Sequence, residues 1–253
     1  MFKHTFFNYT ANEAQNILSK SLDFEVVWLE TVSSTNDLLR MQLKQKMLKS
    51  PKVILTWEQT KGRGQFDRTW HSLNKQCLMM SLCFKITKIP QNISLICGLT
   101  VIQVLAEFFP SLDIKIKYPN DIILEDKKLG GILVEIISHG ANHYVIIGMG
   151  LNWFIPKHSK QFSNAIGLDE SIMQLDEDNM FSLIAKILTG WHENTLLCIQ
   201  HEFKYFMLIW EKSVYKKLQS FTLSNQEKIQ GFYSHTIGSN IYINVDNKIV
   251  LLN

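Results

Sequence analysis

The sequence is poor in the features that mark secreted and disulfide-held proteins. Its four cysteines among 253 residues lie far apart and form no CxxC pair, so neither a disulfide framework nor a zinc site is predicted. The amino-terminal MFKHTFFNYT lacks a sustained apolar core and a small-residue cleavage site, and we expect no signal peptide. These absences favour a reducing compartment and predict a cytoplasmic protein.

Long apolar runs and an excess of one charge are also missing. The longest apolar stretch, Ile93 to Phe109, contains Gln103 and Glu107 and stops at Pro110, so it is too short and too polar to span a bilayer. The formal charge is only +3, which gives little basis for binding nucleic acid. We expect no membrane or nucleic-acid partner. The segment before Ser33 is also too short for a stable helix-turn-helix domain.

Apolar runs that alternate with helical patterns predict a mixed sheet with helices in one domain over residues 1–216. Strands are expected at Phe24–Glu30, Val53–Gln59, Cys77–Lys85, Asp113–Tyr118, Ile132–Ser138 and Tyr144–Asn152. Helices are expected at Asn12–Lys20, Thr35–Leu48, Ile93–Phe109 and Met180–Lys216, the last with a break near Gly190. After Lys216 the composition changes to Ser, Asn, Gly and β-formers, which predicts a small β module over residues 217–253.

The segment QTKGRGQFDRTW, Gln59 to Trp70, follows a predicted strand and combines two glycines with two arginines. Gly62 and Gly64 can take backbone conformations closed to other residues and leave N–H groups uncovered, and the planar guanidinium of Arg63 suits a carboxylate or phosphate. The segment is therefore a candidate anion-binding loop. A flexible surface loop would explain it about as well.

A second candidate lies in the strand expected at Asp113–Tyr118, where lysines alternate with isoleucines. Lys115 and Lys117 should therefore project from the face opposite the apolar side chains. The proline that follows favours a turn that brings Asn120 and Asp121 beside Lys117. An ordinary half-exposed strand followed by a turn is the alternative.

Glycines mark two further strands. Gly130 and Gly131 precede ILVEII, an apolar run typical of a central strand covered on both faces, and YVIIGMGLNW carries Gly148, Gly150 and Asn152. Glycines in strands allow a ligand to approach the backbone, and the amide of Asn152 can recognise a polar ring edge such as that of adenine. Packing needs would also explain the glycines.

The segment SSTND, Ser33 to Asp37, supplies hydroxyls and an amide where a strand gives way to a helix. Ser and Thr are preferred helix caps. One of these residues can cap the helix while its neighbour binds a ligand.

Taken together and in this order, STND, QTKGRGQFDRTW, KYPNDI with KKLGGILVE, and GMGLNW resemble the motif series of the biotin protein ligases, in their short form without an amino-terminal DNA-binding domain. The resemblance implies an α+β catalytic domain, in which a mixed β-sheet is flanked by helices as in class II aminoacyl-tRNA synthetases, and a small SH3-like β module after it. It also implies an enzyme that forms biotinyl-5'-AMP from biotin and ATP with Mg²⁺. The biotin would then pass to a lysine of the carboxyl carrier domain of a biotin-dependent carboxylase, such as acetyl-CoA carboxylase.

The same resemblance implies roles for individual residues. Arg63 and Lys117 would be the catalytic cations that meet the biotin carboxylate and the α-phosphate of ATP. Biotin would contact Ser34, Thr35, Asn36, Gln59, Gly62, Arg63, Gly64, Gln65, Lys117 and Gly131. ATP would contact Arg63, Arg68, Trp70, Lys117, Asn120, Lys128 and Asn152, and Asp121 is a possible metal ligand. Such preplaced cations lower the electrostatic barrier between two reacting anions.

The sequence departs from the family pattern in the arginine loop. The family commonly has GRGR followed by Gly or Asn, whereas Gln65 replaces the second arginine here and Asp67 follows Phe66. An amide can donate to a carboxylate but neutralises no charge, so we predict retained activity with a leakier adenylate. Tyr118 in place of the usual tryptophan keeps an aromatic ring.

Three other functions remain as alternatives. A lipoate or octanoate ligase or transferase has the same catalytic fold, but its arginine-and-triple-glycine motif is absent here. A non-catalytic biotin-binding or sensing protein would keep the pocket and lose turnover through Gln65, although retention of Arg63 and Lys117 argues against it. A transcriptional regulator ranks third, because no DNA-binding segment can be placed.

Overall fold

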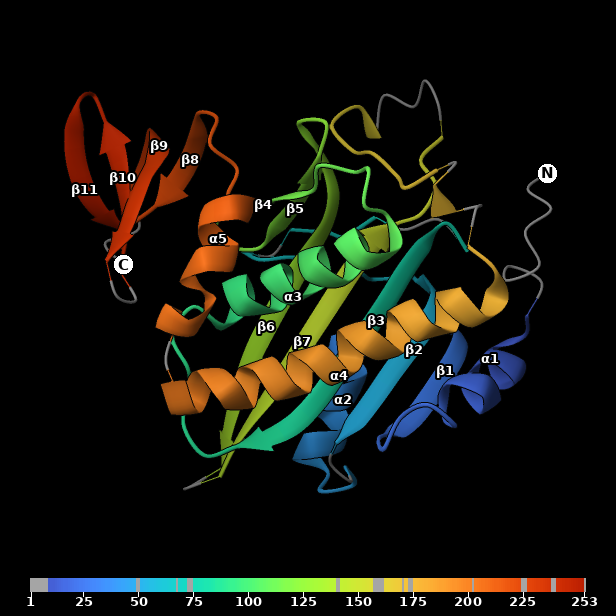
Figure 1. Cartoon of the computed structure of the whole chain (residues 1–253). Coiled ribbons are helices and arrows are strands. Elements are labelled where there is room, and N and C mark those ends of the chain that lie inside the picture. The colour runs from blue at the N-terminus through green and yellow to red at the C-terminus, as the bar shows by residue number, and fades with distance from the viewer. Residues whose placement is uncertain are drawn as a thin grey trace.

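The computed structural model describes residues 9–48, 51–66, 68–71, 75–139, 142–156, 162–169, 171–172, 175–201, 203–223, 227–237 and 240–252. Asp67 lies outside these ranges. The described chain forms a seven-stranded mixed sheet flanked by helices and a separate four-stranded antiparallel sheet near the carboxyl end (Figure 1). The expected mixed sheet with flanking helices and the small carboxyl-terminal β module are both present.

The main sheet has the order β1-β2-β3-β7-β6-β5-β4. Its strands are β1 Glu25–Val32, β2 Lys52–Gln59, β3 Cys77–Ile86, β4 Lys115–Lys117, β5 Asp121–Leu124, β6 Lys127–His139 and β7 Asn142–Asn152. β1 and β2 are parallel, and the remaining neighbours are antiparallel. This order places β3, β7 and β6 side by side, so side chains far apart in sequence meet on the same face.

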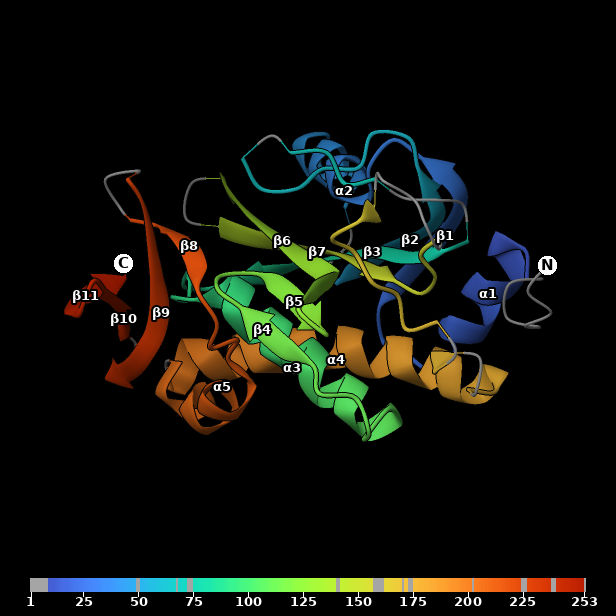
Figure 2. The same ribbon diagram turned by 90° about the horizontal axis from the view of Figure 1, so that it is seen from above.

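Helices cover the two faces of this sheet unequally (Figure 2). α3 Ile93–Phe108 and α4 Glu177–His201 lie side by side on one face, where the Trp191 indole donates to the Cys97 carbonyl at 3.0 Å. α1 Ala11–Leu18 packs on β1 and α4, and α2 Thr35–Lys44 crosses the opposite face. The larger core therefore lies under α3 and α4, and α2 leaves part of the other face open.

Two expectations about individual elements were wrong. α4 runs without a break through Gly190, and the interruption comes later, at the 3-10 helix Phe203–Phe206 before α5 Met207–Ser213. The glycine is there for close packing, because a Cβ at Gly190 would lie 2.7 Å from Cγ2 of Thr100 on α3. The ILVEII segment is only partly covered: Ile132 is buried, whereas the residues from Leu133 to Ile137 are half-buried, with Val134 and Ile136 against the larger core and Ile137 against the smaller one.

The carboxyl-terminal sheet has the order β11-β10-β9-β8, with β8 Gln219–Thr222, β9 Lys228–Ile237, β10 Asn240–Val245 and β11 Lys248–Leu252. Its anchor to the rest of the chain is Trp210 of α5, which is fully buried and donates from its indole to the Thr236 hydroxyl at 3.0 Å. A domain boundary between residues 216 and 217 stays a prediction. Within the described ranges, no helix combines the length and the apolar character needed to cross a membrane.

Candidate active site

A cavity of about 140 Å³ opens on the α2 side of the sheet, between α2, the arginine loop and strands β5 to β7. It brings together most of the predicted site residues: Ser34, Thr35, Asn36, Gln59, Arg63, Gly64, Gln65, Arg68, Trp70, Asn120, Asp121, Lys128 and Gly131. A larger cleft of about 640 Å³ between β4, β5 and α5 contains none of them. The smaller cavity is therefore the candidate active site.

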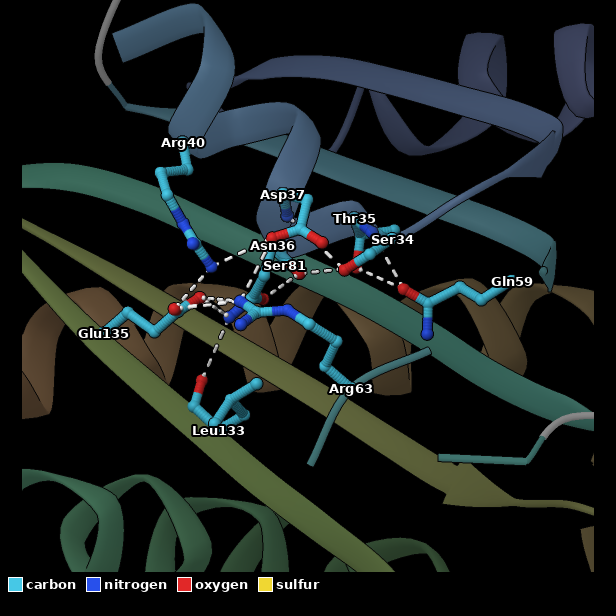
Figure 3. Close-up of polar contacts among 10 residues, drawn as sticks. All are labelled: Ser34, Thr35, Asn36, Asp37, Arg40, Gln59, Arg63, Ser81, Leu133 and Glu135. Atoms are coloured by element: carbon cyan, nitrogen blue, oxygen red, sulfur yellow. Dashed lines mark hydrogen bonds and ion pairs between the residues drawn. The ribbon is translucent and has the colours of Figure 1, made fainter. Parts of the chain in front are cut away.

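One end of the cavity is an uncharged polar wall at the start of α2. Ser34 caps the helix by accepting from the Asp37 N–H at 3.4 Å, which confirms the predicted cap. The backbone N–H and the hydroxyl of Thr35 lie 2.8 and 3.1 Å from Oε1 of Gln59. The Ser81 hydroxyl on β3 lies 2.6 Å from both Thr35 Oγ1 and Asn36 Oδ1. This buried network orders hydroxyl and amide groups along the wall (Figure 3).

The other end is charged. Nη2 of Arg63 lies 2.8 and 2.9 Å from the two carboxylate oxygens of Glu135 on β6, and 3.1 Å from Asp37. Arg40 of α2 reaches the same two acids, with distances of 2.6 Å to Glu135 and 2.9 Å to Asp37. Both arginines thus converge on Glu135 in Figure 3, and Asn36 donates to it at 2.9 Å.

Glu135 stays ionised in this setting. Its burial alone would raise its pKa, but hydrogen bonds from Arg63 and Asn36 and the positive charges of Arg63 and Arg40 outweigh burial and lower the pKa below the ordinary value of 4.5. The charge of Arg63 is therefore largely compensated within the protein itself.

Trp70 packs over strands β6 and β7 at Gly131 and Gly150. A Cβ at Gly150 would lie 2.2 Å from the indole ring, and one at Gly131 would lie 3.2 Å from Cε of Lys128. The Lys128 ammonium stands 5.6 Å from the Trp70 ring centre and pairs with Asp121 at 2.6 Å. Gly150 thus makes room for the Trp70 ring, and the same packing sets a cation beside an aromatic face at the cavity.

The arginine loop is a narrow hairpin. Arg63 and Thr69 form an isolated antiparallel bridge, and the Trp70 N–H donates to the Gly62 carbonyl at 2.9 Å. Gly62 is buried beneath this hairpin, where a Cβ would lie 2.5 Å from the Trp70 carbonyl oxygen. Gly62 therefore shapes the loop and does not line the cavity.

Two other predicted residues lie outside the cavity wall. Lys117 is half-buried on β4, directly across from Asp121, and Ile114 and Ile116 are buried on the opposite side as expected. Asn152 is buried, and its amide donates to the carbonyls of Lys128 and Ile166, each at 3.2 Å. Asn152 thus ties together the backbone segments at Lys128 and Ile166.

Sequence reasoning missed four polar residues that build the site: Asp37, Arg40, Ser81 and Glu135. Two of them carried a signal. Ser81 and Glu135 are single polar residues inside the apolar segments LMMSLCF and ILVEII, and a buried polar group needs a partner. In the part of the chain that the structure describes, no group of three or more His, Cys, Asp or Glu side chains is arranged to hold a metal ion.

The fold and the site can now be compared with those of known proteins. Residues 28–152 match the family described as Biotin/lipoate A/B protein ligase, so this segment of the chain is similar to that family. More particularly, its relatives are biotin protein ligases. The bifunctional ligase/repressor BirA of Escherichia coli is 28% identical over 205 residues, which cover 79% of this chain and 62% of that protein. The biotin--[acetyl-CoA-carboxylase] ligase of Mycobacterium tuberculosis is 31% identical over 106 residues, which cover 40% of this chain and 38% of that protein.

Solved structures agree on the fold. The biotin protein ligase of Aquifex aeolicus, in complex with biotin and ATP, superposes with a TM-score of 0.72 at 24% identity and covers 90% of this chain and 95% of its own. The chain spans less than two thirds of the length of its bifunctional relatives.

Proposed function

We propose that this chain is an ATP-dependent biotin protein ligase. It forms biotinyl-5'-AMP and then transfers the biotinyl group to a lysine of a biotin carboxyl carrier domain. The observation that carries the proposal is a single cavity lined both by the uncharged hydrogen-bonding groups of Ser34, Thr35 and Gln59 and by the basic side chains Arg63, Arg68 and Lys128. A ligand with a polar ring and a carboxylate tail matches both kinds of group.

The uncharged wall suits the ureido ring of biotin. A ureido group needs donors for its oxygen and acceptors for its two N–H groups, and Ser34, Thr35 and Gln59 are of the right kind for both. The hydroxyl and amide groups are held by the network around Ser81, so little ordering remains to be done when the ligand enters.

The cations suit the first reaction. A carboxylate oxygen of biotin attacks the α-phosphorus of ATP, the bond to the β-phosphate oxygen breaks, and pyrophosphate leaves. Two anions must approach each other, so positive charge from Arg63 and Lys128 on the cavity wall, and from Lys117 across from Asp121 on the neighbouring strand, stabilises the transition state. Removal of one such contact typically costs about 3 kcal/mol.

Mg²⁺ would accompany ATP, and the chain offers a limited set of ligands for it. Asp121 supplies one carboxylate at the cavity, already paired with Lys128. Mg²⁺ usually combines one or two carboxylates with phosphate oxygens and water, so the residues present fit an ion held mainly by ATP. Bound there, it would neutralise charge on the departing pyrophosphate.

In the second reaction the neutral amine of the carrier lysine attacks the carbonyl carbon of the adenylate. AMP leaves with the electron pair of the broken C–O bond, and the new amide releases one proton. The chain positions the adenylate and shields it from water, a task for the hairpin that ends at Trp70. The four free, buried cysteines support a cytoplasmic setting for this work.

The test is the mass of a carrier domain after incubation with the protein, biotin and MgATP. We expect a gain of one biotinyl group that requires ATP, is lost in Lys117→Ala, and is retained in the matched control Lys115→Ala. Lys115 lies on the same strand and pairs with Asp113. Biotin binding without any mass gain would instead favour the sensing protein, and a gain from lipoate or octanoate would favour the related ligase.

A further inference from the structure

We infer that Glu135 is a positioning residue: it holds the Arg63 guanidinium by one nitrogen so that the remaining donors stay directed at the ligand's anions. The inference rests on the proposed function and extends it to Glu135, which ends the KKLGGILVE motif and to which the resemblance assigns no role. Glu135 lies outside the set of residues that line the cavity, so it acts through the side chains that it contacts.

The anchoring of Arg63 is one-sided. Only Nη2 reaches Glu135, at 2.8 and 2.9 Å, and the same nitrogen reaches Asp37 at 3.1 Å. Among the described residues, Nε of Arg63 is buried and has no hydrogen-bond partner. A guanidinium has five N–H donors in a fixed plane, so fixing one corner orients the others. A buried N–H without a partner is costly, and an incoming carboxylate or phosphate oxygen would satisfy it.

Arg40 makes this anchor stable. It shares Oε1 of Glu135 with Arg63, at 2.6 Å, and also binds Asp37 at 2.9 Å. Two acids and two arginines thus form a closed cluster of zero net charge. Because Arg40 holds Glu135 from α2, the carboxylate does not have to follow Arg63 when the latter engages a ligand.

The same carboxylate is joined to the uncharged wall. Asn36 donates to Glu135 at 2.9 Å, and its amide oxygen lies 2.6 Å from the Ser81 hydroxyl, which in turn lies 2.6 Å from Thr35. Asn36 and Ser81 are almost completely buried. Gly148 makes room for this link, because a Cβ there would lie 2.2 Å from Asn36 Oδ1. One hydrogen-bonded chain therefore sets the distance between the two ends of the site.

The test compares Glu135→Gln with Glu135→Asp in biotin-dependent exchange of pyrophosphate into ATP. The glutamine keeps an oxygen for Asn36 but loses the charge that holds Arg63, so kcat should fall roughly 10- to 100-fold, the scale of a misplaced group. Biotin affinity, measured by calorimetry, should change by less than about threefold, because the ring contacts persist. Glu135→Asp should recover a large part of the rate.

A double-mutant cycle tests whether Glu135 acts through Arg63. If Glu135 works through Arg63, then Glu135→Gln combined with Arg63→Ala should be no slower than Arg63→Ala alone. The matched control is Glu25→Gln, which removes a carboxylate paired with Lys52 at 2.8 Å on the far edge strand of the same sheet and should leave kcat unchanged.

Four results would overturn the inference. They are an unchanged kcat in Glu135→Gln, faster exchange with tighter biotin binding in that variant, fully additive losses in the cycle, or equal losses in Glu135→Gln and Glu135→Asp that follow the melting temperature. The second would mean that Glu135 competes with the ligand for Arg63. If the unaltered chain showed no exchange with biotin, the proposed function would fail and the inference with it.

Discussion

Gln65 is the residue at which the site departs most from the pattern of the family. It lies half-buried on the cavity wall, in the same loop as Arg63 and Arg68. Arg63 is already paired with Glu135 and Asp37, so the loop contributes less uncompensated positive charge than its composition implies. A bound adenylate would therefore be held less firmly than with an arginine at this position.

We predict that Gln65→Arg slows the release of free biotinyl-5'-AMP. A hydrogen bond from a charged donor stabilises a complex by about 1.5–3 kcal/mol, which corresponds to at least about a tenfold change in dissociation. Free adenylate is measured in the filtrate after incubation with biotin and MgATP. Gln230→Arg on β9 adds the same charge far from the cavity and is the control; equal release from all three proteins would contradict the prediction.

His192 gives the stability of the fold a dependence on pH. Its ring lies against Phe24 and Phe84, with centroid distances of 5.6 and 4.7 Å. Burial lowers the pKa of His192 below the ordinary 6.5, and the nearby Glu193 opposes this only in part. The unfolded chain therefore takes up a proton near pH 6.5 that the folded chain resists, so stability should decrease as the pH falls below about 6.5 and be level above it.

The variant His192→Gln should lose this part of the pH dependence. The measurement is the free energy of unfolding in urea between about pH 5 and 8. We expect a shallower decrease toward low pH in the variant than in the parent. Parallel curves for the two proteins would show that His192 does not contribute.

At the scale of elements, two effects on stability oppose each other at Gly190, where α4 packs against α3. Glycine in a helix interior destabilises it by about 0.5–1 kcal/mol relative to alanine. At Gly190, however, a Cβ would lie 2.7 Å from Cγ2 of Thr100. The Thr100 hydroxyl is needed as well, because it donates to the Ile96 carbonyl and accepts from Asn194 at 2.9 Å each.

We predict that Gly190→Ala destabilises the protein on its own and stabilises it in a Thr100→Ser background. Serine keeps the hydroxyl and removes the methyl group that blocks the Cβ. In that background the alanine should raise the free energy of unfolding by up to about 1 kcal/mol. Urea unfolding of the four proteins forms a double-mutant cycle, and additive effects would refute the proposed clash.

The same helix shows where prediction from sequence stops. Local patterns placed α2, β2, β3 and α3 within a few residues, because each has a clear apolar periodicity and recognisable ends. The break expected at Gly190 was wrong because tertiary packing at Thr100 outweighs helix propensity. Strand β5 was missed because it has only four residues, Asp121–Leu124, and follows a turn that dominated the local pattern.

Many residues of the site could be predicted from sequence motifs, whereas the contacts between them could not. The motifs predicted that Thr35, Gln59 and Arg63 lie at one site, and all three line one cavity. They do so because these residues end or follow neighbouring strands. Glu135 and Ser81 were not identified, since their partners depend on how β3, β6 and β7 align under α2, which no local pattern encodes. The role of Asn152 at a ligand stays a prediction; its amide donates to the carbonyls of Lys128 and Ile166.

At the scale of the whole molecule, the carboxyl-terminal sheet and the main sheet share one apolar core. Phe221, Ile241 and Ile243 belong to the same cluster of contacting buried residues as α3 and α4. Trp210 connects them, since its ring meets Tyr233 edge-on with centroids 5.3 Å apart. Such continuity favours a single cooperative unfolding unit over two independent ones.

We predict that Trp210→Ala destabilises the whole chain and not only the small sheet. Loss of a buried tryptophan costs about 3–5 kcal/mol. Thermal melts followed by far-ultraviolet and near-ultraviolet circular dichroism should move down together. Leu208→Ala on the same helix, at a side chain that is 77% exposed, should shift neither. Two separate transitions in the parent would instead establish residues 217–253 as an independent module.

The placement of the tryptophans allows the candidate active site to be followed by intrinsic tryptophan fluorescence. Of the six tryptophans, Trp28, Trp57, Trp153, Trp191 and Trp210 are each no more than 3% exposed. Trp70 alone is half-buried, and it lies on the cavity wall. An aqueous quencher such as acrylamide therefore reaches one indole in this protein. The quenchable fraction of its emission reports whether the site is filled, with no dye attached and no residue changed.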